Sequence, residues 1–71
     1  MKEVFNNNMY AIYEIFKGEY IIIDKPVNAT VAYFQMRDNF VYHFTPLLAY
    51  CLSCHNYYID AINEYINKGV K

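Results

Sequence analysis

The sequence predicts an α+β fold: a small antiparallel sheet of three to four strands, formed by two hairpins, packed on one long C-terminal helix. Residues 9–44 are rich in β-branched and aromatic side chains and are interrupted by short turn-forming segments. Residues 46–67 instead repeat apolar side chains at spacings of three and four, the period of an amphipathic helix. With 71 residues, the chain is expected to form a single domain with a marginal core.

A first hairpin is predicted after a loose N-terminus of residues 1–8, which ends in three asparagines. Residues 9–16 and 19–24 are its strands. The turn is Lys17-Gly18, because glycine accepts the positive φ that a tight hairpin turn needs. An alternative is a short helix over residues 9–17, capped by Asn8 and ended by Gly18. Both interpretations make residues 20–24 a strand.

A second hairpin is predicted after residues 25–28, where Pro26 interrupts the strand pattern. Residues 30–36 and 40–44 are its strands, and they flank the turn-forming triplet Arg37-Asp38-Asn39. Both faces of these strands carry apolar side chains. One face is therefore expected to meet the helix, and the other a partner or a second layer.

The helix is predicted to begin at Thr45-Pro46 and to end near Gly69. A threonine hydroxyl can accept a hydrogen bond from the first turn, and proline at the first helical position needs no N–H group. A helix over 46–67 is roughly 33 Å long, whereas strands of five to seven residues span about 17 to 24 Å. Two neighbouring apolar seams also make its buried face unusually wide.

The length and the wide apolar face of this helix predict a second chain, either a homodimer partner or another protein. Aromatic residues make up 20% of the chain, with nine tyrosines, and tyrosine is common at the centres of protein interfaces. The partner-binding residues are predicted to be Leu52, His55, Ile59, Ile62, Tyr65 and Ile66 on the helix, with Tyr33 and Tyr42 on the sheet.

No set of residues predicts catalysis. The chain has only two glycines, so it lacks a glycine-rich phosphate loop, and it shows neither a nucleophile with a base at a known spacing nor paired carboxylates in a defined frame. The sequence therefore predicts a protein that is not an enzyme, with no catalytic residues and no cofactor.

Residues Cys51-Leu52-Ser53-Cys54-His55 match the C-x-x-C-H pattern of c-type haem attachment. A zinc site that adds His43 as a fourth ligand is a second alternative. Both patterns lie within the predicted helix, which does not easily aim neighbouring ligands at one metal centre. The favoured interpretation is that the two thiols are small core residues and that the chain binds no metal.

Six basic and seven acidic side chains give a formal net charge of −1, so there is no basic field to attract nucleic acid or anionic lipid. An alternative function is the binding of single-stranded nucleic acid, in which bases stack on Tyr33, Tyr42 or neighbouring phenylalanines. The N-terminus has no apolar signal segment, and an apolar run such as residues 20–23 is far too short to span a membrane. A cytoplasmic protein without membrane contact is expected.

The function predicted from these features is a small non-enzymatic protein-interaction module that binds and covers the surface of another protein. Asn, Ile, Lys, Tyr and Phe, whose codons are AT-rich, make up 35 of the 71 residues. Short chains of this composition are common in phages and mobile elements, so an inhibitor of a host protein system, such as an anti-CRISPR protein, is one expected form of this module.

Overall fold

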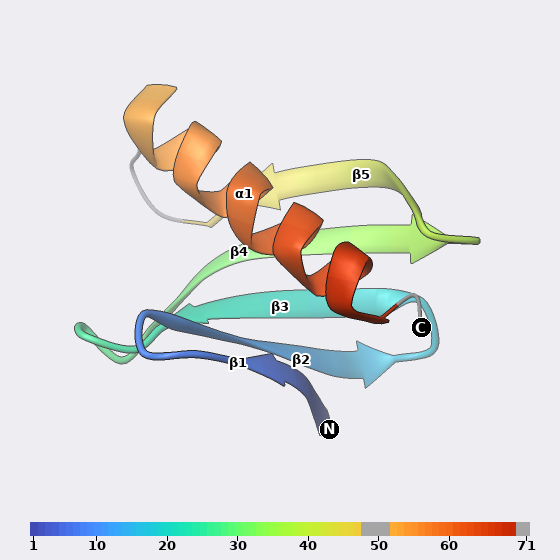
Figure 1. Cartoon of the computed structure of the whole chain (residues 1–71), viewed down its shortest axis with the longest axis horizontal. Helices are drawn as coiled ribbons and strands as arrows, with labels where there is room; N and C mark the ends of the chain where they lie inside the picture. Colours follow the sequence, from blue (N-terminus) through green and yellow to red (C-terminus); the bar gives the residue numbers. More distant parts are fainter. Residues whose placement is uncertain (48–51, 70–71) are drawn as a thin grey trace.

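The computed structural model describes residues 1–47 and 52–69, and for residues 52–56 and 69 it describes the backbone alone. The described chain forms one five-stranded sheet and one helix (Figure 1). Strands that follow one another in the sequence are neighbours in the sheet, and every pair is antiparallel. This confirms an α+β fold with an antiparallel sheet and a C-terminal helix. The elements are β1 (Lys2–Asn6), β2 (Tyr10–Phe16), β3 (Glu19–Asp24), β4 (Ala29–Arg37), β5 (Phe40–Pro46) and α1 (Leu52–Gly69).

The sheet has five strands, not three to four, because residues 2–6 form β1 instead of a loose N-terminus. The asparagines after it build the turn to β2. The side-chain Oδ1 of Asn7 accepts hydrogen bonds from the backbone N–H groups of Met9 and Tyr10, at 2.8 and 2.9 Å. Phe5 then stacks on Tyr10, with ring centroids 5.8 Å apart. The asparagines therefore mark a turn between two strands.

Both predicted hairpins are present, and residues 10–16 are a strand, so the helical alternative for this segment is wrong. Gly18 has a φ of 79°, and an added Cβ would lie 3.2 Å from the carbonyl oxygen of Met36. Asp38 and Asn39 adopt φ values of 53° and 67° between β4 and β5. Positive φ at both central residues is what a two-residue hairpin turn requires.

The helix does not begin at Thr45-Pro46, because these two residues belong to β5, where they pair with Tyr33 and Ala32 of β4. Proline is tolerated there because β5 is an edge strand and needs no outward N–H group. The described helix runs over 18 residues, Leu52–Gly69, and crosses one face of the sheet diagonally (Figure 1). Its first turns extend beyond β5 in this view.

The core lies between this helix and the sheet. Ile12, Ile22 and Phe34 come from three neighbouring strands and are all 0% exposed. Phe34 stacks on Tyr20, with ring centroids 5.0 Å apart. The helix contributes three buried residues at the spacing of one helical face: Tyr58, Ala61 and Ile62.

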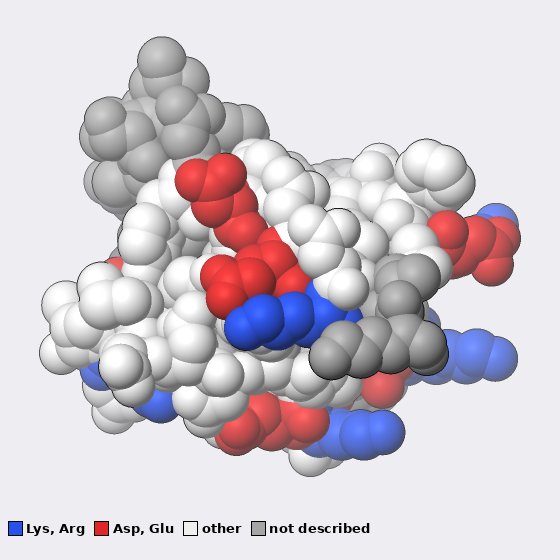
Figure 2. All heavy atoms as spheres, viewed as in Figure 1, with Lys and Arg blue, Asp and Glu red and all other residues white. Residues whose placement is uncertain are grey.

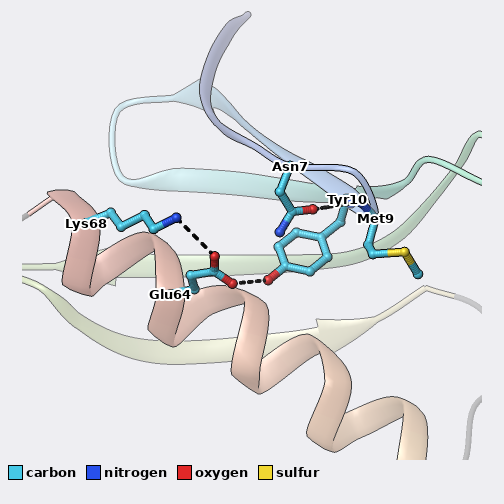
Figure 3. A network of polar contacts seen from close by, with 5 residues as sticks. All are labelled: Asn7, Met9, Tyr10, Glu64 and Lys68. Carbon is cyan, nitrogen blue, oxygen red and sulfur yellow. Dashed lines mark hydrogen bonds and ion pairs between the residues drawn. The ribbon is translucent and has the colours of Figure 1, made fainter.

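A polar contact fixes the helix on the sheet (Figure 3). The Tyr10 hydroxyl donates a hydrogen bond to Oε2 of Glu64 at 2.7 Å, and Nζ of Lys68 lies 3.2 Å from Oε1 of the same carboxylate. Burial, and then the bond to Glu64, raise the pKa of Tyr10 to about 12. The bond from Tyr10 lowers the pKa of Glu64. Strand β2 and helix α1 are therefore joined by a hydrogen bond as well as by apolar packing.

Candidate functional site

The face of the sheet opposite α1 is the candidate site. Within residues 1–47 and 52–69, α1 is the only element outside the sheet, and it lies on the other face. Side chains alternate along a strand, and residues paired across strands point to the same face. The strand register then defines the open face by these residues: Glu3, Asn6, Ala11, Tyr13, Phe16, Glu19, Ile21, Ile23, Thr30, Tyr33, Gln35, Arg37, Phe40, His43 and Thr45.

The centre of the open face is apolar. Tyr13, Ile21 and Tyr33 pair across three central strands, and Ile23 lies one position further along β3. All four side chains are half-buried although no described element covers them. An antiparallel sheet with one solvated face normally carries polar residues on that face, so this apolar centre is unusual. It requires an explanation beyond the stability of the single chain.

Four residues of the open face are linked by side-chain contacts. The Tyr33 hydroxyl donates a hydrogen bond to Oε1 of Glu19 at 2.8 Å, and this bond raises the pKa of Tyr33. The Tyr33 ring meets the His43 ring edge to face, at a centroid distance of 6.1 Å. Nε2 of His43 lies 2.7 Å from Oγ1 of Thr45. These contacts hold the Tyr33 ring in one orientation, so the surface is ordered before a partner arrives.

The end of the sheet at the β4–β5 turn carries exposed aromatic side chains. Phe40 is 75% exposed and Tyr42 is 59% exposed. The guanidinium carbon of Arg37 lies 5.8 Å from the centroid of the Tyr42 ring. These residues and Asp38 line an open hollow of about 340 Å³. Tyrosine and arginine are the residues that most often carry binding energy in protein interfaces.

The opposite end of the open face is polar. Nζ of Lys25 donates hydrogen bonds to Oδ1 of Asn6 at 2.7 Å and to the carbonyl oxygen of Asn7 at 2.8 Å. Nδ2 of Asn6 donates in turn to Oε1 of Glu3 at 2.8 Å. The apolar centre is thus bordered by hydrogen-bonded polar groups, an arrangement typical of protein interfaces.

The predicted partner-binding residues separate into two groups. Tyr33 lies at the centre of the open face, whereas Tyr42 is an exposed residue of β5 at the irregularity in its pairing with β4. On the helix, Ile62 is 2% exposed and packs against the sheet of its own chain, so it has no surface for a partner. Three others are partly buried in the same contact: Ile59, Tyr65 and Ile66. The side chains of Leu52 and His55 lie outside the described residues.

The wide apolar face of the helix packs on a sheet of five strands, one to two more than the sequence predicts. The residues that sequence reasoning missed are Tyr13, Ile21 and Ile23. A signal for them was present in the run Tyr20–Ile23, which places apolar side chains on both faces of one strand. A run of this kind indicates a strand that is covered on both sides.

The described residues contain no group of three or more His, Cys, Asp or Glu side chains that could hold a metal ion. Of the four residues in the zinc alternative, only the His43 side chain is described, and it contacts Thr45 and Tyr33. Cys51 and the side chains of Cys54 and His55 lie outside the described residues. The described helix is not long and apolar enough to cross a membrane.

Charge is mixed over the molecule. On the helix side, acidic and basic groups occur in small separate clusters with uncharged surface between them (Figure 2). On the open face, the carboxylate of Glu19 lies next to Tyr33 and that of Glu3 lies on the edge strand β1, while the cations Lys25 and Arg37 lie at the two ends of the face. A surface that binds nucleic acid would concentrate cations next to its aromatic rings.

No protein-family model, no curated protein and no solved structure matches this chain.

Proposed function

We propose that this protein is a non-enzymatic protein-interaction module that binds its partner through the open face of the sheet. The observation that carries this proposal is the half-buried apolar centre made by Tyr13, Ile21, Ile23 and Tyr33, which no described element covers. An apolar surface of this kind is unfavourable in water. Covering it with a partner stabilises the complex by about 25 cal/mol per Å² of buried apolar area.

The border of the open face supports a protein partner in particular. Hydrogen-bonded polar groups surround the apolar centre, and Phe40 and Tyr42 add exposed aromatic surface at one end. Interfaces between proteins combine an aromatic and aliphatic centre with a polar rim. The contacts that hold Tyr33 and His43 also reduce the side-chain entropy lost on binding.

Single-stranded nucleic-acid binding is the weaker alternative. Stacking on Tyr33 would bring a phosphate backbone near the Glu19 carboxylate, which already accepts the Tyr33 hydroxyl. Carboxylates beside the stacking ring would repel that backbone, because nucleic-acid affinity comes largely from cations that neutralise phosphates. The charge distribution therefore favours a protein as the partner.

The finer proposal is that the partner belongs to a host system that a phage or mobile-element protein inhibits, as an anti-CRISPR protein does. Support comes from the short chain and from the AT-rich codons of its residues. A small rigid face with an apolar centre is suited to covering a surface of another protein without catalysis. This proposal places the protein in the cytoplasm of a bacterial host.

Affinity purification of the tagged chain from a low-GC bacterial host tests the proposed function. We expect one stoichiometric protein partner, which Ile21→Glu abolishes because it places a charge at the centre of the open face. The matched control is Asn63→Glu, at an exposed position of α1. Circular dichroism checks that both variants fold. Capture of nucleic acid instead of protein would favour the alternative, and an equal yield of partner with both variants would place binding elsewhere.

A further inference from the structure

We infer that in the free protein a second copy of this chain covers the open face, packed face to face across a two-fold axis. This inference rests on the proposed function, because it takes the open face as a protein-binding surface, from which a host partner would have to displace the second copy. Three observations carry it: the area of the face, the positions of large and small side chains on it, and the positions of its charges.

The open face is large enough to approach the area that a dimer interface needs. Strands of five to nine residues are roughly 17 to 30 Å long, and five strands are about 24 Å wide. The face therefore has a projected area of about 500 Å², and protruding side chains increase its accessible area. Stable interfaces bury about 600 to 1,000 Å² per partner. Two sheets can pack in this way at a separation of about 10 Å.

The strand register makes this face complementary to itself. Consider a two-fold axis that lies between the sheets, perpendicular to the strands, at the level of Ile22 on the central strand β3. Ile21 then meets Ile23 of the second copy, one residue on either side of the axis. On β2 the same axis places Tyr13, which pairs with Ile21, against Ala11, which pairs with Ile23. A large side chain thus meets a small one, as close packing requires.

The same axis pairs opposite charges. Glu19 begins β3 and its carboxylate lies on the open face, while Lys25 follows the other end of β3 and bonds to Asn6 of that face. The two-fold axis therefore places Glu19 of one copy near Lys25 of the other, and the symmetry repeats this pair. Glu3 meets the uncharged Asn6 of the second copy, so the carboxylates of the open face do not meet one another. Charges arranged in this way select the register of an interface.

Sedimentation analysis of the full chain between 1 and 200 μM tests the inference. We expect a species of twice 8.5 kDa. Glu19→Lys and Lys25→Glu should each weaken the dimer roughly ten-fold, because each replaces two attractive pairs by two repulsive ones. The double variant should return the dissociation constant to within about three-fold of the original. Asp60→Lys, on the exposed side of α1, is the matched control and should change nothing.

A monomer at 200 μM overturns the inference. A dimer that Ile21→Glu leaves intact, or single reversals that the double variant does not rescue, also overturn it, since the contact then lies on another surface or in another register. These experiments also distinguish failure of the dimer from failure of the proposed protein-interaction function. If the chain is monomeric but captures another protein through Ile21, the second copy is the wrong occupant and the interaction module stands. If it captures no protein and stays monomeric, both fail.

Discussion

The two faces of the sheet are built from alternating residues of the same strands, and both are apolar at their centres. On the helix face, Ile12, Ile22 and Phe34 are completely buried. On the open face their neighbours Tyr13, Ile21 and Tyr33 remain half-buried, with no described element above them. Apolar content alone therefore does not distinguish residues that stabilise the fold from residues that bind a partner. The two groups differ in whether an element of the same chain packs over them.

The largest expected effect compares two neighbouring residues on opposite faces. Phe34→Ala should lower the free energy of unfolding by about 3 to 5 kcal/mol, because it leaves a cavity beneath α1 where Phe34 is 0% exposed. Tyr33→Ala should cause a much smaller loss, since Tyr33 is half-buried without a cover. Urea unfolding at low micromolar protein concentration measures both. Equal losses would mean that the open face contributes to the fold of the single chain as much as the core does.

A smaller effect concerns the hydroxyl groups of the two faces. Tyr10→Phe should cost about 1 kcal/mol, because it removes the hydrogen bond to Glu64 that joins β2 to α1. Tyr33→Phe removes the bond to Glu19 on the open face and should cost less, since water can replace it there. Thermal unfolding of the two variants, side by side, measures the difference. A larger loss from Tyr33→Phe would contradict this order.

The smallest effect is a pH dependence that belongs to the helix face. The pKa of Glu64 is lower in the folded chain than its ordinary value of 4.5. Its contribution to stability is therefore complete above about pH 4.5 and is lost as the pH falls through the folded value. Urea midpoints between pH 3 and 6 should fall less steeply for Glu64→Gln than for the unmodified chain. If the urea midpoints of the two proteins change equally with pH, the contacts of Glu64 with Tyr10 and Lys68 do not contribute to stability.

Turn chemistry and periodicity made much of the fold predictable. Gly18 and the pair Asp38-Asn39 favour the positive φ values that the two hairpin turns adopt, and the spacing of apolar residues predicts the C-terminal helix. The start of this helix was wrong for a physical reason. Thr45-Pro46 has the local chemistry of a helix N-terminus, but pairing with β4 extends β5 through Pro46.

The candidate site was only half predictable. The apolar faces of the strands over residues 30–36 and 40–44 predict Tyr33 and Tyr42 as binding residues. A sheet of three to four strands is too small to cover the helix, so the sequence predicts a partner contact for Ile62, which is in fact 2% exposed in the core. The strand β1, which ends at Asn6 and is followed by a turn held by Asn7, supplies part of the missing surface through Phe5. Short polar segments carry weak strand signals, so β1 is recognised only by its pairing with β2.

The sequence by itself determined the strands of residues 20–24, 30–36 and 40–44, the presence of a C-terminal helix, both hairpin turns and the apolar character of both sheet faces. These features depend on backbone preferences and on the alternation of side chains within a few residues. Only the tertiary structure decided which face α1 covers, that Ile62 belongs to the core, and that Tyr13, Ile21 and Tyr33 form one surface. These facts depend on the pairing of segments that lie far apart in the chain. Local propensity carries no information about such pairing.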